Sequence, residues 1–196
     1  MAFSLVEGTF SALIFDCDGT LVDSAPAHLR SLQEALRPLG LTVTEEWYQT
    51  RHGLGPDPLN RDEPAKMIAR MAKRKTAIGA LLMDQSIVSG LGNIYRAELL
   101  YRAKLSPFRA GADVPVATLK SIWKDACALM PGAMVDRRIV TTRAKDRPHS
   151  KGEAMDEEVH YVYRRKGRPC FVCGTKVETK VMAGRNLFWC PVCQAE

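Results

Sequence analysis

Residues 86–105, SIVSGLGNIYRAELLYRAKL, place a glycine-rich turn directly before a helical pattern. The preceding residues 76–85, TAIGALLMDQ, are apolar on most faces and predict a buried helix. Gly90, Gly92 and Asn93 interrupt that pattern before the helical spacing resumes. Glycine adopts backbone conformations that other residues avoid, so a tight turn is expected here. The stretch therefore predicts two helices joined by a glycine turn.

Two amphipathic helices are predicted on either side of this unit. Residues 63–75 can form a helix that buries Met67, Ile68 and Met71 on one face. Residues 116–130, VATLKSIWKDACALM, repeat apolar side chains at helical spacing. These helices would cover the glycine-turn unit and form one helical domain.

The chain changes character after this helical region. Residues 131–158 are polar, basic and poorly periodic, so we expect an extended or mobile loop there. Residues 159–165, VHYVYRR, alternate apolar and polar side chains as a strand does. This strand would lead into a cysteine-rich segment.

Four of the six cysteines form the pattern C-x2-C-x16-C-x2-C at positions Cys170, Cys173, Cys190 and Cys193. In an intracellular chain this spacing favours a metal site over disulfides, because two C-x-x-C turns can close a tetrahedral Zn²⁺ site across a short β-hairpin. With four cysteine ligands, no coordination position remains for water. The zinc is therefore expected to be structural.

The segment MAGRN, residues 182–186, is the expected tip of this hairpin. Gly184 permits a tight turn, and Arg185 would project from it. An arginine on a stiff, metal-fixed tip suits a bidentate grip on a phosphate. The alternative is an ordinary solvated turn residue.

Charge separates the chain into two unlike parts. Residues 1–52 hold 3 basic and 7 acidic residues, a net charge of −4, whereas residues 53–196 hold 25 and 15, a net charge of +10. A basic domain of this kind attracts polyanions, most commonly nucleic acid, and a merely solvated basic surface is the alternative. No apolar run reaches the roughly 18 residues of a membrane span, and Glu7 argues against a signal peptide, so we expect a cytoplasmic protein.

The opening segment SALIFDCDGTLVDS, residues 11–24, reads as a strand entering an acidic loop and then a leucine-rich helix. It resembles the first motif of the haloacid dehalogenase superfamily of phosphatases, and the resemblance extends to residue 52. It implies that Asp16 attacks phosphorus and Asp18 acts as acid and base, with Thr20 nearby and Mg²⁺ as cofactor. The strands that would complete such a site are missing after residue 53, so we expect an incomplete βα fragment of a Rossmann-like fold.

A second resemblance covers residues 53–196. The pieces LGPDPL (54–59), LLMDQSIVSGLGNIYRAELLYRAKLSP (81–107) and GRNLFWCPVCQ (184–194) resemble the C-terminal half of the formamidopyrimidine-DNA glycosylase and endonuclease VIII family. The likeness implies a helix-two-turn-helix followed by a zinc finger, and double-stranded DNA, damaged or abasic, as partner.

The same likeness implies site residues. Asn93 and the backbone around Gly90 and Gly92 would bind phosphates that flank the lesion, and Arg185 would hold the same strand from the finger. The residue types agree, because glycine lets backbone N–H groups approach a phosphate and a helix start adds its dipole. A simple helix cap is the alternative for Asn93.

The chain departs from that family at its start, where Met1 is followed by Ala2 and Phe3. The family's nucleophile is the amine of a proline directly after the initiator methionine, followed by a catalytic glutamate. We therefore expect a DNA-binding module of a base-excision-repair glycosylase and AP lyase that lacks its nucleophile, associated with the nucleoid in a bacterium. The alternatives are an incomplete Mg²⁺-dependent phosphatase with an aspartate nucleophile and an inactive chimera.

The expected fold is mainly α with a small zinc-bound β-hairpin, preceded by the phosphatase-like fragment. The expected division comprises a truncated phosphatase-like segment (1–52), a helix-two-turn-helix domain (53–150) and a zinc-finger hairpin (151–196). The junction near residue 53 falls in RHGLGPDPLN, which has the glycine and proline content of a boundary.

Overall fold

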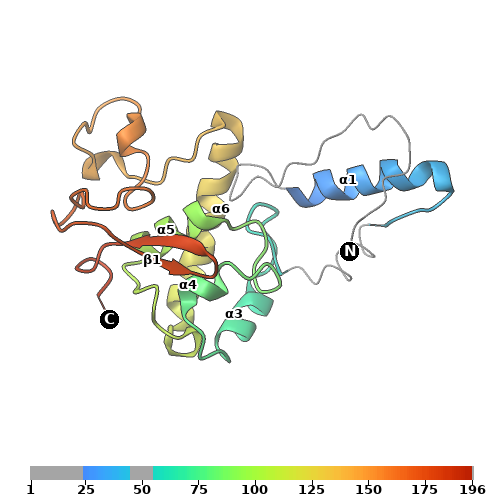
Figure 1. Ribbon diagram of the computed structural model, residues 1–196, viewed down its shortest axis with the longest axis horizontal. Coiled ribbons are helices and arrows are strands. Elements are labelled where there is room, and N and C mark those ends of the chain that lie inside the picture. Colours follow the sequence, from blue (N-terminus) through green and yellow to red (C-terminus); the bar gives the residue numbers. More distant parts are fainter. Residues whose placement is uncertain (1–23, 45–54, 196) are drawn as a thin grey trace.

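The computed structural model describes residues 24–44 and 55–195. Helix α1 (Ser24–Leu36) continues into a short 3₁₀ turn, η1 (Arg37–Leu39), so the helix expected after the acidic motif is confirmed. Figure 1 shows α1 to one side of the remaining elements. Asp16, Asp18, Thr20 and the junction near residue 53 lie outside the described residues, as does the expected first strand.

Helices dominate the rest of the described chain. The first three are α3 (Ala65–Met71), α4 (Ile78–Leu81) and α5 (Asn93–Arg102). After the 3₁₀ turn η2 (Gly111–Asp113), the long helix α6 (Val116–Asp136) crosses behind α5 (Figure 1). The predicted order of helix, glycine turn and helix is confirmed, although α4 spans only four residues.

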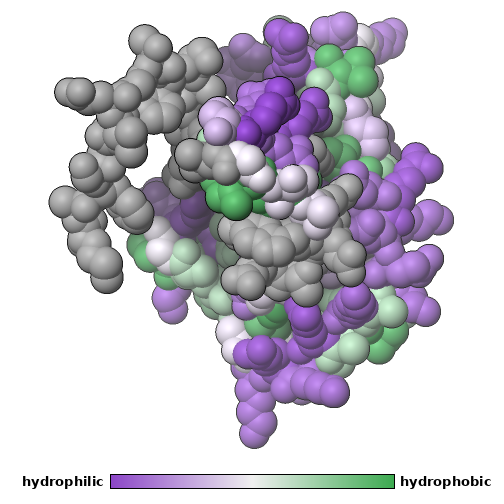
Figure 2. Space-filling model, turned by 90° about the vertical axis from the view of Figure 1, so that its right-hand side faces the viewer, coloured by the Kyte–Doolittle hydropathy of each residue, from purple (hydrophilic) through white to green (hydrophobic). Residues whose placement is uncertain are grey.

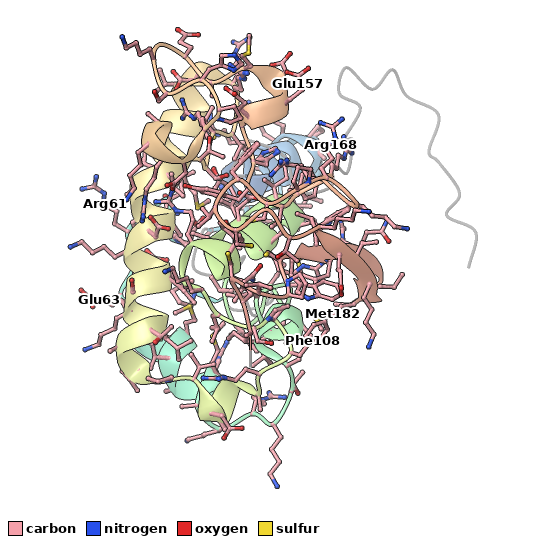
Figure 3. The ribbon with its side chains drawn as sticks, turned by 90° about the vertical axis from the view of Figure 1, so that its left-hand side faces the viewer. Arg61, Glu63, Phe108, Glu157, Arg168 and Met182 are labelled. Atoms are coloured by element: carbon pink, nitrogen blue, oxygen red, sulfur yellow. The ribbon has the colours of Figure 1, made fainter. Side chains whose placement is uncertain are left out.

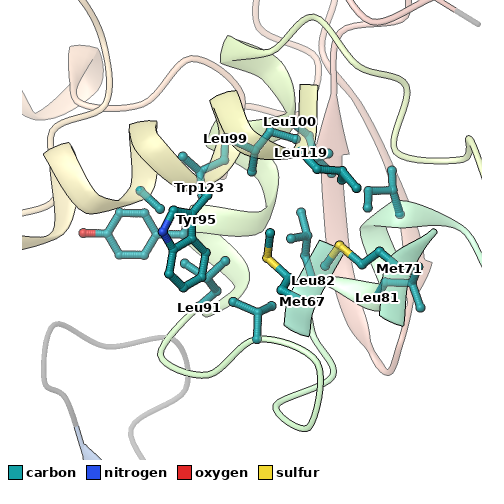
Figure 4. Packing of buried hydrophobic residues seen from close by; sticks show 14 of the residues in the cluster. Met67, Met71, Leu81, Leu82, Leu91, Tyr95, Leu99, Leu100, Leu119 and Trp123 are labelled. Atoms are coloured by element: carbon teal, nitrogen blue, oxygen red, sulfur yellow. The ribbon is translucent and has the colours of Figure 1, made fainter. Parts of the chain in front are cut away.

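Side chains from α3, α4, α5 and α6 meet in one hydrophobic core, which Figure 4 shows at close range. The expected apolar stripes point inward, with Met67 and Met71 from α3 at 1% and 0% exposure. Trp123 and Leu119 contribute from α6, beside Leu99 from α5. Burial of several large apolar side chains, each worth about 1.5–3 kcal/mol, makes this core the main stabilising element of the helical region.

Helix α6 extends six residues beyond the predicted end, through Pro131 to Asp136. The expectation of a loop from residue 131 is therefore wrong for this turn. A proline removes one backbone donor from a helix, but Met130 and Ala133 bury their side chains in the core and hold the last turns in place. Arg137, with φ of 49°, then ends the helix in a left-handed conformation.

Residues 159–165 form turns rather than the predicted strand. The reason is Glu98, a fully buried carboxylate on α5. Its oxygens accept backbone N–H bonds from Tyr161 at 2.8 Å and from Val162 and Tyr163 at 2.9 Å. Three successive N–H groups that turn toward one carboxylate cannot alternate sides as they do in a strand. Charge-assisted hydrogen bonds of this kind fix the segment against α5.

The C-terminal region contains the only sheet among the described residues, an antiparallel hairpin of β1 (Glu178–Met182) and β2 (Arg185–Trp189). Two 3₁₀ turns, η3 (Ala144–Asp146) and η4 (Asp156–Glu158), lie between α6 and this hairpin. Strand β2 packs against α5, and Figure 1 shows the hairpin lying across that helix. The mainly helical fold with one small hairpin is thus as predicted.

The surface carries no large apolar face in the view of Figure 2, where hydrophobic residues form small patches among hydrophilic ones. Exposed large apolar residues such as Val135 and Val181 come from different elements. Within residues 24–44 and 55–195, no helix is both long and apolar enough to cross a bilayer.

Candidate nucleic-acid interface and zinc site

The glycine turn between α4 and α5 is held by the segment LGPDPL. The Gly55 N–H donates to the Gln85 carbonyl at 2.8 Å, and the Ser89 N–H donates to the Pro56 carbonyl at 3.1 Å. A Cβ on Gly55 would lie 2.3 Å from the Ile87 carbonyl group, so only glycine allows the two segments to approach this closely. The segment therefore shapes the turn that precedes α5.

Gln85 closes the turn from within. Its side-chain oxygen accepts from the Gly90 N–H at 3.1 Å, and its Nε2 donates to the Leu91 carbonyl at 3.0 Å. Gly90 has φ of +76°, and a Cβ there would lie 2.9 Å from Oδ1 of Asp57. The Gly90 N–H, expected to face a phosphate, thus donates to Gln85 in this structure. Sequence reasoning missed Gln85 because an exposed glutamine in a loop carries no distinguishing pattern.

Gly92 is the residue before α5, with an extended backbone (φ −105°, ψ −171°). The first N–H groups of an α-helix have no acceptor within the helix, and they carry the positive end of its dipole. In α5 these groups begin at Asn93. The end of the glycine turn therefore presents a site that favours an anion.

Asn93 links this helix start to the zinc hairpin. Its Nδ2 donates to the Asn186 carbonyl on β2 at 3.0 Å, and its Oδ1 accepts a hydrogen bond from Arg96. Arg96, one turn further along α5, also donates to the Met182 carbonyl on β1 at 2.9 Å. Met182 is the last residue of β1, next to the hairpin turn, and is labelled in Figure 3. Two parts of the chain that are 93 residues apart thus meet at one place.

The hairpin tip is a tight turn that includes Gly184, as predicted, and it has two central residues. Met182 pairs with Arg185, and Ala183 and Gly184 between them have φ of 52° and 73°. Positive φ at both central residues matches the right-handed twist of the strands and gives a tight hairpin. Arg185 follows the turn directly and is half-buried. The tip is thereby placed beside Arg96 and Asn93.

Positive charge is concentrated at this junction. Burial, together with the nearby Arg185, lowers the pKa of Arg96 to about 10. The two guanidinium groups repel each other and lie next to a helix N-terminus. A bound anion would reduce this repulsion. The arrangement suits a phosphate.

The four predicted zinc ligands come together at the other end of the hairpin. The Sγ atoms of Cys170, Cys173, Cys190 and Cys193 all lie within 4.8 Å of one another. The Cys170–Cys193 and Cys173–Cys190 sulfur distances are 3.9 and 3.4 Å. A tetrahedral zinc site with bonds of about 2.3 Å places its sulfur atoms about 3.8 Å apart. The four thiols therefore fit a structural zinc ion.

Helix α5 also contacts the zinc site. The Tyr101 hydroxyl lies 3.0 Å from the Sγ of Cys170, and its ring stacks on Tyr161 with centroids 4.5 Å apart. Burial, followed by the hydrogen bond to Cys170, raises the pKa of Tyr101, so the hydroxyl remains a donor. Hydrogen bonds from outside the ligand shell orient ligands and stabilise thiolate charge. Sequence reasoning missed this role, since Tyr101 occupies an ordinary core position of a helix.

Comparisons with known families match the same two regions. The family described as "Formamidopyrimidine-DNA glycosylase H2TH domain" matches residues 54–144, and "Zinc finger found in FPG and IleRS" matches residues 167–195. The matched residues begin at 54, so the phosphatase interpretation of residues 11–52 and its Mg²⁺ gain no support.

Curated relatives agree with these families. Endonuclease 8 1 of Mycobacterium bovis is 42% identical over 142 residues, which are 72% of this chain and 53% of the relative. The formamidopyrimidine-DNA glycosylase of Geobacillus kaustophilus is 37% identical over 142 residues, 72% of this chain and 51% of the relative. The chain thus spans about half the length of the curated relatives it matches.

Solved structures show the same fold. The Lactococcus lactis FPG mutant G226P in complex with Fapy-dG DNA superposes with a TM-score of 0.62 at 25% identity, covering 76% of this chain and 54% of that one. MutM (FPG) of Thermus thermophilus has a TM-score of 0.59 at 30% identity, covering 74% and 55%. Residues 54–144 and 167–195 are therefore the helix-two-turn-helix domain and the zinc finger of the formamidopyrimidine-DNA glycosylase and endonuclease VIII family.

Proposed function

We propose that residues 53–196 form the double-stranded DNA-binding module of a base-excision-repair glycosylase and AP lyase. The observation that carries this proposal is the junction of Asn93, Arg96 and Arg185, which joins an open helix start to the tip of the zinc hairpin. Hydrogen-bond donors and positive charge from two distant segments converge there, as a phosphate backbone requires.

The proposed division of labour follows the expected domains. The helix-two-turn-helix part, residues 53–150, supplies Asn93 and the turn around Gly90 and Gly92, and the finger, residues 151–196, supplies Arg185. Four cysteine thiolates, those of Cys170, Cys173, Cys190 and Cys193, hold the zinc that stiffens the finger. The names of structural neighbours support a duplex with a lesion as ligand, since they describe complexes with Fapy-dG DNA and with an abasic site.

DNA binding can be tested by fluorescence anisotropy with a labelled duplex that carries an abasic-site analogue. Affinity is expected to fall steeply as salt rises, because phosphate contacts release counterions. Asn93→Ala and Arg185→Ala should each weaken binding and lower the slope against log salt by about 1 if each loses one phosphate contact. Lys120→Ala, an exposed cation on α6, is the control and should change the slope less. Unchanged binding in both site variants would refute the proposal.

We infer that this module binds without excising bases. The catalytic amine that the family resemblance implies is an N-terminal proline, and residues 53–196 contain no N-terminal amine. Borohydride reduction traps a Schiff base between such an amine and an abasic sugar. Residues 53–196 should therefore supply no such amine, and a robust adduct that peptide mass spectrometry maps to these residues would contradict the inference.

A further inference from the structure

Arg96 is a buried cation whose acidic partner is missing from the described part of the chain. Its side chain is 0% exposed, and its Nε is buried with no hydrogen-bond partner among the described residues. Its two terminal nitrogens reach the Asn93 amide oxygen and the Met182 carbonyl, both of which are neutral acceptors. By contrast, Arg102 on the same helix pairs with Asp125 at 2.5 Å.

Such a burial is costly for stability alone. Removing a guanidinium from water is unfavourable unless a counter-charge compensates it. Arg185 increases this cost, since its charge contributes to the lowered pKa of Arg96. A neutral residue of the same length could fill the space without that penalty. Arg96 is therefore better explained by what it does to its two acceptors.

The first acceptor determines how Asn93 is oriented. An asparagine amide has a donor end and an acceptor end, and only the donor end can bind a phosphate oxygen. Arg96 occupies the acceptor end through Oδ1, which leaves Nδ2 directed away, toward the Asn186 carbonyl. Nδ2 carries two hydrogens, so one remains for a further acceptor. Arg96 thus sets the polarity of the Asn93 side chain.

The second acceptor determines where the hairpin tip lies. Met182 is paired with Arg185 across the last position before the turn. A charge-assisted bond from Arg96 to the Met182 carbonyl therefore fixes the position of Arg185 relative to α5. One side chain thereby sets both proposed DNA contacts.

We propose that Arg96 is a positioning residue that couples Asn93 and Arg185, so that both engage the DNA backbone as one unit. This rests on the proposed function, which assigns the two contacts. Arg96 itself need not touch DNA; it acts by orienting the amide and by holding the tip. The phosphate then supplies a negative charge near Arg96, which has no acidic partner among the described residues.

The test is a set of mutant cycles in the Arg96→Met background, measured with the same labelled duplex over a range of salt. Arg96→Met should weaken binding about tenfold or more and lower the salt slope by about 1 to 2, as if both contacts were lost. In that background Asn93→Ala and Arg185→Ala should have little further effect, since the contacts they remove are already misplaced.

Arg102→Met is the matched control. It removes a half-buried guanidinium from the same helix but leaves the junction intact. A purely structural role for Arg96 would make the two variants alike: a lower unfolding midpoint, an unchanged salt slope, and full effects of Asn93→Ala and Arg185→Ala in each background. That result would overturn the proposal.

Arg96→Lys keeps the test decisive if Arg96→Met does not fold. Lysine retains the charge but cannot span both acceptors with a rigid fork. It should restore folding, judged by zinc content and urea midpoint. In the lysine variant the effects of Asn93→Ala and Arg185→Ala on DNA affinity should then be independent of each other. If the effects of the two substitutions depend on each other in the lysine variant as much as in the wild-type protein, the proposal is contradicted. If the wild-type protein shows no salt-dependent DNA binding, the proposed function fails instead, which separates the two outcomes.

Discussion

The helical region and the zinc region are stabilised in different ways. Among the described residues, the helical core joins 20 buried hydrophobic residues, whereas the core under the zinc hairpin joins 8. Two of those eight, Ala97 and Tyr101, belong to α5, and two more are the zinc ligands Cys170 and Cys190. A core this small cannot offset the conformational entropy of its segment. The zinc region therefore depends on a metal ion and on polar anchors from a neighbouring helix.

Removal of the zinc should produce the largest difference in stability between the two regions. Structural zinc ions contribute about 10–16 kcal/mol of apparent binding free energy in small fingers, so a chelator should unfold residues 167–195. Helices α3, α4 and α6 should keep their protection, because their core does not involve the metal. Hydrogen exchange by mass spectrometry measures both regions in one experiment.

The control for this prediction is Cys127→Ser, since Cys127 lies on α6 outside the four-cysteine cluster. That variant should retain zinc and the same exchange pattern after chelation. Equal loss of protection in both regions would show that the helical core depends on the metal as well. DNA binding should disappear with the zinc, because Arg185 loses its fixed position.

Glu98→Gln should have the next largest effect. The carboxylate accepts three backbone N–H bonds, and an amide would turn one acceptor into a donor that faces them. Hydrogen bonds to charged groups are worth about 1.5–3 kcal/mol each, so a loss of about 3 kcal/mol in unfolding free energy is expected. Urea denaturation measures it. The exposed Glu157→Gln should be neutral, and a neutral Glu98→Gln would mean that other contacts hold residues 161–163.

Tyr101→Phe sharpens the comparison by separating the metal site from the core around it. The ring and its stacking on Tyr161 remain, but the hydroxyl beside Cys170 is lost. Loss of such an outer hydrogen bond typically lowers metal affinity about 10-fold or more. Competition with a chromogenic chelator reads this out. Tyr95→Phe, a buried tyrosine in the helical core, is the matched control and should leave zinc affinity unchanged.

Ala183→Asn should give a small gain in stability. Ala183 has φ of 52°, a conformation that costs an ordinary L-residue about 1–2 kcal/mol, and Asn-Gly is the preferred pair for such a turn. A rise in the unfolding free energy of up to about 1 kcal/mol is expected in thermal or urea denaturation. Ala183→Val should lower it, because a β-branched residue tolerates positive φ poorly. A destabilised asparagine variant would indicate that the tip is constrained by more than its turn.

The parts of the site that were predictable carry a residue-type signature. Cysteine spacing predicts the metal cluster, because four thiols at those intervals have few other uses. Glycine and apolar periodicity predict the helix pair and the turn between them. Each signal arises within a short window of sequence, so no knowledge of distant contacts is needed.

The parts that were not predictable depend on distant backbone groups. Arg96 and Glu98 look like polar positions of an amphipathic helix, yet their partners are the Met182 carbonyl and the N–H groups of residues 161–163. Every residue except proline has both groups, so no residue type marks them. The same contacts explain why the predicted strand at 159–165 is wrong. Periodicity reflects the pattern of side chains along one segment. Here the Glu98 side chain, from helix α5, determines the backbone conformation of residues 161–163.

The three backbone hydrogen bonds from residues 161–163 to the Glu98 carboxylate make these positions differ in their tolerance of substitution. These bonds do not depend on which side chains occupy residues 161–163, because the carboxylate accepts hydrogen bonds from main-chain N–H groups. Natural homologues can therefore differ at those residues as far as side-chain packing allows. The glutamate has no such freedom, since a single substitution there would remove all three hydrogen bonds to residues 161–163. Sequence variation among natural homologues should therefore be greater at residues 161–163 than at Glu98.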